Sequence, residues 1–576
     1  MRFLSIGVKG LRSFVDVNLA LDRRLNVIVG ENNVGKSSFL GAIGLVKALP
    51  TGPLPETYWP DGKWSGPLSL SLSVRLNKLE LATIGEKLRF PESKGALSGA
   101  ALQEKIGNLF SIQIEWERPH FVPKFEMKFT RADGRDAATV SPSMGNEYVL
   151  SEGLLTLGSG VYGQIVKLLN EQYVSFPEFR QRPQSSATEV LQSTEGIHIA
   201  SVLFLLRNGT RQQVTRFNRV KALFGSIFPG LRLEVTKSPG SPPALVIERK
   251  AGRHRIPLDS VGAGIAEMVI MLAHIAAESS KVFAVDEPEL HLHPHSQRLL
   301  SGILRESSQN NQFMVVSHSP HFVDSRNLSS VAIVRQESGR SSVVRLDENY
   351  LDAYETVAIS KNLGVEEKEF LFSRRVFLVE GPTENGAMPV LAKKVRRGFD
   401  EHGVSMISVG GNSFGLMMKV LKGFGFPWLA MCDRDVLMNV SDSMEVDGKE
   451  LKCSRFFEAI KKASMMDSED KRVLLQCQKV VKVNRNGKSW MVFSDDGFEQ
   501  FRQCASRHGF RVIVPDFEGY LKENGCEALF EEAEAAYGSS KVLQGRYVAE
   551  NMTTVPEALE SIIKELTAVD FRMNLP

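Results

Sequence analysis

The sequence predicts an α/β protein made of two successive α/β domains, and three observations support this fold class. A buried apolar strand at 25–29 runs straight into a glycine-rich loop at 30–37 and then into a helix. Beyond residue 370, short apolar runs alternate with helical segments, which indicates a second parallel sheet covered by helices. Between these regions lie three apolar runs typical of buried parallel strands, at 282–285, 313–316 and 331–334.

The composition is that of a globular protein, with 43% hydrophobic and 24% charged residues in a chain of 576. This length predicts roughly three or four domains. Because the net charge is only +3, a nucleic-acid surface would have to be a local patch. No signal-peptide core and no apolar stretch of membrane-spanning length are present, so we expect a cytoplasmic protein without membrane association. The five cysteines form no CxxC pair, which favours reduced thiols over zinc ligands.

The first half of the chain predicts strands around the glycine-rich loop, followed by a helical segment. The expected elements are two short strands within 1–30, a helix at 37–49, alternating strands at 68–76 and 110–129, helical chain over 153–220 with a break at 176–180, and a strand pair at 231–235 and 244–249 that returns to the first sheet.

The second half begins after a polar, mostly helical segment at 346–370, where we place the domain junction. Four strands are expected beyond it, at 376–379, 406–409, 428–431 and 512–514. Residues 436–510 are charged and partly helical, and they predict an insertion with a hairpin near 480–493.

The glycine-rich loop has the pattern of a phosphate-binding loop, with a strand before it and a helix after it. Its backbone N–H groups would cradle phosphate oxygens at the helix N-terminus. Gly30 and Gly35 permit the required backbone, Lys36 reaches the β- and γ-phosphates, and Ser37 coordinates Mg²⁺. The residues expected to bind ATP in this loop are Gly30, Asn32, Asn33, Gly35, Lys36, Ser37 and Ser38.

A second nucleotide element follows the apolar run at 282–285. Asp286 ends this strand, where its carboxylate can hold Mg²⁺ through water. Glu287 is placed to polarise the water that attacks the γ-phosphate. The alternating histidines His291, His293 and His295 do not favour a zinc site, because no cysteine lies nearby and Pro294 interrupts them.

Residues 286–294 resemble the Walker B segment and D-loop of ABC-type ATPases. Ser260, Gly262 and Gly264 resemble the signature motif of that family, and His318 resembles its switch histidine. In that family the signature residues act on ATP bound to the opposite subunit, so the resemblance implies two protomers or heads that close over nucleotide. The Q-loop glutamine stays open between Gln103 and Gln113.

A second set of acidic residues follows the strands of the second domain. Glu380 and Glu384 lie in a Glu-Gly-x-Thr-Glu motif after one strand, and Asp433 and Asp435 end another. Carboxylates at the carboxyl ends of adjacent parallel strands converge on one crevice. They would repel one another unless a divalent cation neutralises them, and hard oxygen ligands favour Mg²⁺ or Mn²⁺. Such a set suits phosphodiester hydrolysis.

Two further positions in this domain could complete the site. Asp516 and Glu518 follow a third strand, and either could complete the metal shell. The whole arrangement looks like a Toprim domain, the catalytic fold of type II topoisomerases, bacterial primases and certain nucleases. In nucleases of this type a basic residue near the C-terminus often completes the site, and here the candidates are Lys541 and Arg546.

Taken together, the chain resembles the OLD (overcoming lysogenization defect) family of ATP-dependent nucleases, which includes the Gabija nuclease subunit. The resemblance is weakest over 150–255 and 436–510. It implies an ABC-type ATPase at 1–149 and 256–347, a helical dimerisation insert at 150–255, and a Toprim nuclease domain at 348–576. The implied activity is ATP-regulated, metal-dependent DNA cleavage or nicking in anti-phage defence. It would be carried out by a homodimer or higher homo-oligomer, with a helicase or a reverse transcriptase–RNA complex as a candidate partner.

Two other readings start from the same motifs. The first is a repair ATPase of SMC or RecF type with a non-catalytic Toprim domain, but no sustained heptad run predicts its coiled-coil arms. The second is a topoisomerase or primase, but no nucleophile stands out among the nine tyrosines. The basic run at 393–397 could contact DNA phosphates or could be a solvated helix face.

Overall fold

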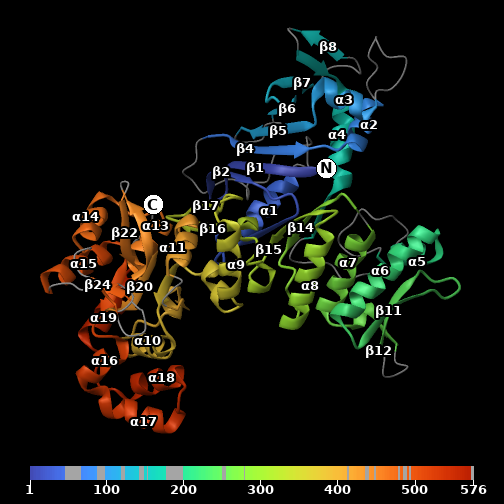
Figure 1. Ribbon diagram of the computed structural model, residues 1–576. Coiled ribbons are helices and arrows are strands. Elements are labelled where there is room, and N and C mark those ends of the chain that lie inside the picture. Colours follow the sequence, from blue (N-terminus) through green and yellow to red (C-terminus); the bar gives the residue numbers. More distant parts are fainter. Residues whose placement is uncertain are drawn as a thin grey trace. The chain divides into compact units, whose positions relative to one another are not determined.

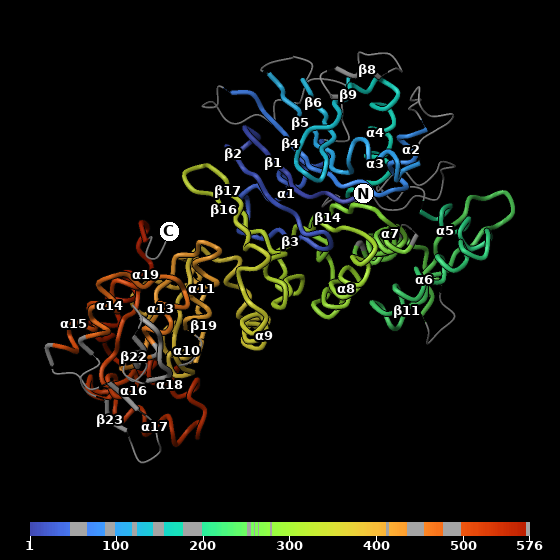
Figure 2. Tube along the Cα trace, turned by 45° about the horizontal axis from the view of Figure 1, so that its top comes forward, coloured from blue at the N-terminus to red at the C-terminus, as the bar shows by residue number. Residues whose placement is uncertain are grey.

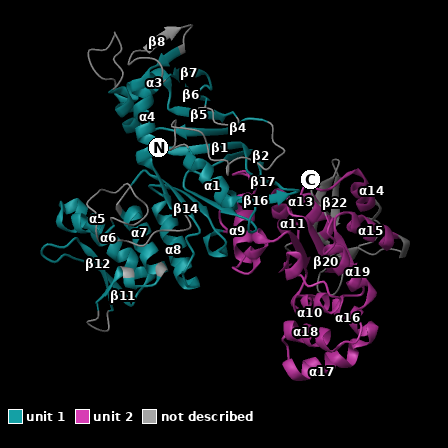
Figure 3. Ribbon diagram, turned by 180° about the vertical axis from the view of Figure 1, so that it is seen from behind, with its two compact units in different colours: residues 1–324, 328–345 teal, residues 325–327, 346–576 magenta. Residues whose placement is uncertain are grey.

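A computed structural model provides the structure of the chain, and its two compact units are coloured separately in Figure 3. Unit 1 comprises Met1–Asp324 and Leu328–Arg345, and unit 2 comprises Ser325–Asn327 and Leu346–Pro576. The structure describes residues 1–45, 66–86, 98–117, 124–141, 148–151, 154–176, 199–249, 255–277, 279–410, 414–434, 440–446, 449–477, 481–483, 489–491 and 495–571.

Unit 1 is built on a large mixed sheet, whose strand order is β10-β14-β15-β3-β16-β17-β2-β1-β4-β5-β6-β7-β9-β8. The strands from β10 to β16 in this order are parallel, and they carry the apolar runs expected of central strands. Every residue of β14 and β15 is buried. The strands are β1 (Arg2–Leu11), β2 (Phe14–Ala20), β3 (Leu25–Val29), β4 (Leu68–Arg75), β5 (Leu109–Trp116), β6 (Lys124–Thr130), β7 (Asp136–Val140), β8 (Tyr148–Ser151), β9 (Leu154–Leu157), β10 (Tyr173–Phe176), β14 (Val282–Asp286), β15 (Gln312–Val316), β16 (Val331–Glu337) and β17 (Arg340–Arg345).

The helices of unit 1 lie against this sheet and beside a smaller one (Figure 1). The hydrophobic core links β1, β4 and β5 with α1, α2, α3 and α4, so the phosphate loop is built onto a well-packed frame. The helices are α1 (Lys36–Gly44), α2 (Lys78–Gly85), α3 (Gly99–Ile106), α4 (Ser159–Gln172), α5 (Ile199–Asn208), α6 (Arg211–Ile227), α7 (Ala263–Ala277) and α8 (Pro294–Ser307).

Two expectations for unit 1 are wrong. The strand pair β11 (Leu231–Thr236) and β12 (Ala244–Arg249) forms where the sequence predicts it, but it does not return to the large sheet. With β13 (Arg255–Pro257) it makes a separate three-stranded sheet. The segment expected to be helical also contains β9 and β10, and β10 pairs with β14 in the large sheet. Three of the four residues of β10 are apolar or aromatic, and so short a run has no period that separates a buried strand from a helix.

Unit 2 contains a parallel four-stranded sheet in the order β19-β18-β20-β25. Figure 2 follows the Cα trace of this unit and labels β19. The four strands predicted from the sequence are confirmed, each within about two residues: β18 (Arg375–Val379), β19 (Val404–Ser408), β20 (Trp428–Asp433) and β25 (Phe510–Ile513). The helices that accompany them are α9 (Ala353–Asn362), α10 (Pro382–Lys394), α11 (Phe414–Gly423), α15 (Asp495–Arg507), α16 (Phe517–Leu521), α17 (Glu527–Tyr537), α18 (Lys541–Asn551) and α19 (Glu557–Leu566).

The expected insertion lies between β20 and β25. Its predicted hairpin is confirmed as β23 (Val481–Val483) with β24 (Ser489–Met491). A second hairpin, β21 (Val440–Val446) with β22 (Lys449–Ser454), was not predicted, and two helices follow it, α13 (Arg455–Lys462) and α14 (Ser468–Cys477). Across the described ranges, no helix combines the length and the apolar character needed to cross a bilayer.

Candidate functional site

The phosphate loop of unit 1 has the backbone that its sequence predicts. Gly30 and Gly35 have positive φ values of 146° and 102°, which side-chain-bearing residues rarely adopt. A Cβ on Gly30 would also lie 2.2 Å from the carbonyl oxygen of Val334 in β16. The loop is therefore held tightly against the sheet where it leaves β3, and α1 begins directly after it at Lys36.

Lys36 is buried within this loop. Its Nζ donates to the carbonyl oxygens of Gly30, at 3.1 Å, and Glu31, at 2.6 Å. Burial lowers the pKa of Lys36 to about 8, although the nearby carboxylates of Glu287 and Asp286 oppose the shift. The ammonium thus has carbonyl partners inside the loop, which a phosphate group could replace.

The end of β14 meets the start of α1. The hydroxyl of Ser37 donates to Oδ1 of Asp286 at 3.3 Å, so two expected ligands of a nucleotide-bound metal are adjacent. The turn between β1 and β2 reaches the same place, because Arg12 Nη1 donates to Ser38 Oγ at 2.6 Å. Arg12 was not among the expected site residues. Its position follows only from the sheet order, in which β1 and β2 lie several strands away from β3.

Glu287 and His318 follow neighbouring parallel strands, β14 and β15. His318 Nε2 lies 3.4 Å from Glu287 Oε1, and Glu287 itself has a positive φ of 44°. A further residue, Glu289, fixes this arrangement. Its buried Oε1 accepts hydrogen bonds from the hydroxyl of Ser317, at 2.9 Å, and from the backbone N–H of His318. Burial raises the pKa of Glu289.

The signature-like residues lie around the start of α7. Ser260 and Gly262 are exposed, whereas Gly264 is buried. A Cβ on Gly264 would lie 2.6 Å from the carbonyl oxygen of His291, so α7 approaches the chain after β14 closely. The exposed pair is accessible on the surface of unit 1, as residues that act on a second subunit's nucleotide would have to be.

The acidic set of unit 2 forms at the carboxyl ends of neighbouring strands. Glu380 follows β18 and Asp433 ends β20, which pairs with β18 in parallel. The backbone N–H of Asp433 donates to Glu380 Oε2 at 3.2 Å. Asp433 Oδ1 in turn accepts a hydrogen bond of 2.8 Å from the N–H of Phe517, which follows β25. Three strand ends thus converge, as the sequence predicts.

The carboxylates in this crevice are close enough to affect one another. Burial raises the pKa of Glu384, in the first turn of α10, to about 7, and the charges of Glu380 and Glu518 add to the shift. Burial also raises the pKa of Asp433 to about 7, with contributions from Glu380, Glu384 and Asp516. Crowded, partly buried carboxylates of this kind favour a bound cation or proton.

Of the two acidic candidates that follow β25, Glu518 contacts Lys541, one of the two basic candidates. Lys541 Nζ lies 2.8 and 2.9 Å from the two carboxylate oxygens of Glu518, and Thr383 Oγ1 donates to Glu518 Oε1 at 2.9 Å. Burial alone would raise the pKa of Glu518, but these hydrogen bonds lower it. Asp516 is oriented differently, because its Oδ1 accepts the N–H of Gly519 at 2.7 Å and caps α16.

Arg546 lies elsewhere on α18. Its Nε donates to Glu550 Oε1 at 2.8 Å along the same helix, and its side chain is 63% exposed. Asp435, the remaining acidic candidate, lies outside the described residues. Among the residues that the structure describes, no three His, Cys, Asp or Glu side chains already stand in a metal-binding arrangement. The donor chemistry nevertheless fits a hard divalent cation, since the crevice offers carboxylate oxygens.

Comparison with protein-family models identifies three matching segments. Residues 371–435 match the model described as "Overcoming lysogenization defect protein-like, TOPRIM domain". Residues 177–324 match "AAA domain, putative AbiEii toxin, Type IV TA system", and residues 5–67 match a second AAA domain model. The acidic motifs from Glu380 to Asp435 thus fall within the TOPRIM match.

The chain is also similar to curated proteins that are named as nucleases. The chain is 23% identical over 467 residues to Endonuclease GajA of Bacillus cereus, covering 76% of this chain and 75% of that protein. It is 27% identical over 193 residues to the OLD nuclease of Thermus scotoductus, covering 31% of this chain and 37% of the relative. The Old nuclease of Escherichia phage P2 is 22% identical over 206 residues, covering 34% and 35%.

Among solved structures, the SMC head bound to the C-terminal winged-helix domain of ScpA aligns with a TM-score of 0.39 at 14% identity. The alignment covers 61% of this chain and 99% of that one.

Proposed function

We propose, on the premise that this chain is an OLD-type nuclease in which a P-loop ATPase module precedes a TOPRIM domain, that it cuts DNA with a divalent metal ion under control of ATP. The observation that carries this proposal is the convergence of Glu380, Asp433 and Glu518 from three strand ends, with Lys541 beside them. The names of the relatives, Endonuclease GajA and OLD nuclease, support a nuclease, and anti-phage defence is the role that we propose for it.

In the cleavage site, Glu380, Glu384 and Asp433 would hold Mg²⁺, for which Mn²⁺ could substitute, with Asp435 and Asp516 as further ligands. The chemistry that a divalent cation would supply at these residues is activation of water and stabilisation of the charge on the phosphodiester. Lys541 keeps Glu518 ionised and places a positive charge next to the crevice, where a DNA phosphate would enter. Thr383 donates a second hydrogen bond to Glu518 and helps to fix its position.

In the nucleotide site, Lys36 and the loop N–H groups would bind the ATP phosphates, and Ser37 with Asp286 would hold Mg²⁺. Glu287 would orient the attacking water, and His318, 3.4 Å away, would sense the γ-phosphate. Ser260, Gly262 and Gly264 would complete the site of a second copy of the chain. The active protein would therefore be a homodimer or a higher homo-oligomer.

The setting proposed for this activity is the cytoplasm of a cell under phage attack. A partner that unwinds or senses DNA, such as a helicase or a reverse transcriptase–RNA complex, would supply the trigger. ATP occupancy of unit 1 would then set the rate at which unit 2 cuts.

Two substitutions separate the two chemistries. Asp433→Ala should abolish plasmid cleavage and leave ATP hydrolysis unchanged, because Asp433 lies in unit 2. Glu287→Gln should slow ATP hydrolysis by roughly 100-fold or more while ATP still binds. Glu550→Ala, which removes an exposed carboxylate from α18 outside the crevice, serves as the matched control. Cleavage by Asp433→Ala at the wild-type rate would contradict the proposal.

A further inference from the structure

The positive charge of the chain is concentrated in one part of unit 1. Residues 199–257 contain eleven lysines and arginines but only two carboxylates, Glu234 and Glu248, which gives this segment a net charge of +9. Because the whole chain carries only +3, all remaining residues together carry −6. The segment forms α5, α6 and the small sheet β11-β12-β13. Nine of the eleven cations and both carboxylates lie in the described residues 199–249 and 255–257, so these elements carry a local excess of positive charge of the kind that binds polyanions.

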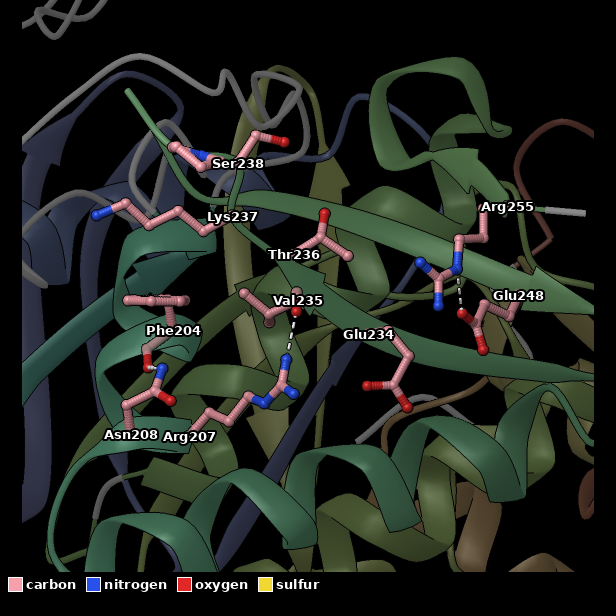
Figure 4. A pocket seen from close by; sticks show the side chains of 11 residues that line it. Phe204, Arg207, Asn208, Glu234, Val235, Thr236, Lys237, Ser238, Glu248 and Arg255 are labelled. Carbon is pink, nitrogen blue, oxygen red and sulfur yellow. Dashed lines mark hydrogen bonds and ion pairs between the residues drawn. The ribbon is translucent and has the colours of Figure 1, made fainter. Parts of the chain in front are cut away.

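A hollow of about 790 Å³ lies between α5 and the small sheet. Figure 4 shows the side chains around it, with Arg207 on the helix side, Lys237 at one end and Arg255 at the other. Phe204 also lines the hollow, but the ammonium of Lys237 lies over its ring, 5.3 Å from the centroid. The lining thus offers cations to a ligand rather than a free aromatic surface.

Both carboxylates of the segment are already paired. Glu248 Oε1 lies 2.6 Å from Arg255 Nε, and Glu234 forms an ion pair with Lys221 of α6. The strand register places Arg232 directly across from Glu248, on the β11 face that Glu234 shares. Glu248 thus lies between two arginines in the three-stranded sheet.

Three cations beside the hollow and at the ends of β11 have no part in this pairing. Arg207 donates through Nη1 to the carbonyl oxygen of Val235, which uses only part of its guanidinium. Arg232 and Lys237 are exposed, and no carboxylate of the described residues forms an ion pair with either. These cations come from α5 and both ends of β11, so they form a row rather than a point site.

We propose that this face, which we call the basic face (Arg207, Arg232, Lys237 and Arg255), binds the sugar-phosphate backbone of duplex DNA. The choice of DNA rests on the proposed nuclease function. An open row of cations fits a repeating phosphate ligand, and duplex DNA presents such a ligand without unstacking its bases. A single strand would need exposed aromatic rings on which its bases could stack, and the one ring in the hollow is covered.

The test measures binding of a labelled duplex to the full chain by fluorescence anisotropy in excess chelator, over a range of salt concentrations. Arg232→Ala/Lys237→Ala is compared with Lys9→Ala/Lys124→Ala, which removes two surface lysines of unit 1 that have carboxylate partners. Each phosphate contact contributes about 0.9 to the slope of log K against log salt. The basic-face variant should bind on the order of tenfold more weakly per removed cation at 0.1 M salt, with a slope smaller by about two.

Equal affinity and equal salt slope for the two double variants would overturn the proposal. It would also be overturned if the basic-face variant lost binding to polyglutamate but not to duplex DNA, since the partner would then be an acidic protein. Both double variants must keep the wild-type midpoint of thermal unfolding. If Arg232→Ala/Lys237→Ala does not, Arg232→Gln/Lys237→Gln takes its place. Plasmid cleavage by the wild type separates the two proposals. If the chain binds duplex DNA with the expected salt dependence but never cuts plasmid, the nuclease proposal is refuted and the DNA-binding proposal stands.

Discussion

Lys541 and Arg546 lie on the same helix, yet only one of them faces the acidic crevice. Five residues of α-helix turn a side chain through about 140°, so the two cannot point to the same place. The structure directs Lys541 to Glu518 and Arg546 to Glu550. The sequence alone could not choose between them, because the choice depends on which face of α18 packs against α10.

Lys541→Ala is expected to lower the rate of DNA cleavage by roughly 100-fold or more, since it removes the cation beside the crevice. Arg546→Ala removes an exposed guanidinium from the same helix and should lower the rate much less. Single-turnover nicking of supercoiled plasmid measures both. Equal losses for the two variants would contradict the assignment of Lys541.

At the same scale, the phosphate loop could be predicted from the sequence because its residues are contiguous. Arg12 and Glu289 could not, since each reaches the nucleotide site through tertiary structure. Arg12 arrives on the β1–β2 turn, and Glu289 is buried beneath His318. Arg12 belongs to no recognised pattern. Glu289 lies in the 286–294 segment, but nothing in that segment indicates its hydrogen bond with the backbone N–H of His318.

At the scale of elements, the crevice depends on how closely α10 and α18 pack. A Cβ on Gly386 would lie 2.0 Å from the carbonyl oxygen of Val542, and one on Gly545 would lie 2.2 Å from that of Thr383. The two helices therefore touch backbone to backbone at these glycines. This contact brings Thr383 and the start of α18 together at Glu518, where Thr383 and Lys541 donate to the same oxygen, Oε1.

Gly545→Ala should force the helices apart, destabilise unit 2 by about 1–3 kcal/mol and impair cleavage, while ATP hydrolysis continues. Gly163→Ala in α4 is the matched control, because a Cβ there meets nothing within 4 Å. That control should be neutral or should stabilise the chain by up to about 1 kcal/mol. Thermal unfolding and plasmid nicking report the two effects, and unchanged nicking by Gly545→Ala would refute the role of the contact.

A buried ionic cluster joins α14 to the end of α15 in the insertion. Asp470 is fully buried and accepts hydrogen bonds from His508 Nε2 and Arg507 Nη2, each at 2.8 Å, and from Cys504 Sγ at 3.2 Å. Burial alone would raise the pKa of Asp470, but the hydrogen bonds from His508, the backbone N–H of Asp467 and Cys504 hold it at about 2. The ionised carboxylate therefore stabilises the folded insertion.

The pKa of Asp470 in the folded chain lies below its ordinary value of 3.8, so the folded state binds fewer protons at this site than the unfolded state. The resulting stabilisation, about 2 kcal/mol, is fully present above pH 4 and is lost as the pH falls towards 2. Hydrogen-exchange protection of α14 and α15, corrected for intrinsic rates, should fall in this window. In Asp470→Asn the protection should be lower at pH 6 and nearly independent of pH; the same acid dependence in both proteins would contradict this account.

The parallel strands of unit 2 were predictable because each contains a short apolar run that is followed by an acidic residue or a turn. The hairpin β21–β22 was not predicted, since its strands mix polar and apolar residues without a clear period of two. In unit 1, β11 and β12 were recognised as strands, but their sheet was not. Sheet membership depends on partners far away in the sequence, which a local pattern does not name.

At the scale of the whole molecule, the two chemistries occupy separate compact units. The phosphate loop, Asp286, Glu287 and His318 lie in unit 1, and the acidic crevice lies in unit 2. The order of these motifs along the sequence is enough to indicate two modules. The concentration of positive charge in residues 199–257 is equally visible in the sequence. Its meaning depends on the fold, which places three of these cations, Arg207, Lys237 and Arg255, around one hollow.

The most direct test of the central claim is cleavage of supercoiled plasmid by the full chain with Mg²⁺ or Mn²⁺, with and without ATP, beside Glu380→Ala. Glu380 contacts the backbone of Asp433 and stands at the centre of the acidic set. We expect nicked and linear products that require the metal, disappear with chelator and are absent for Glu380→Ala, at a rate that changes when ATP is added. Metal-dependent cutting that persists undiminished in Glu380→Ala would contradict the assignment of the cleavage site to unit 2.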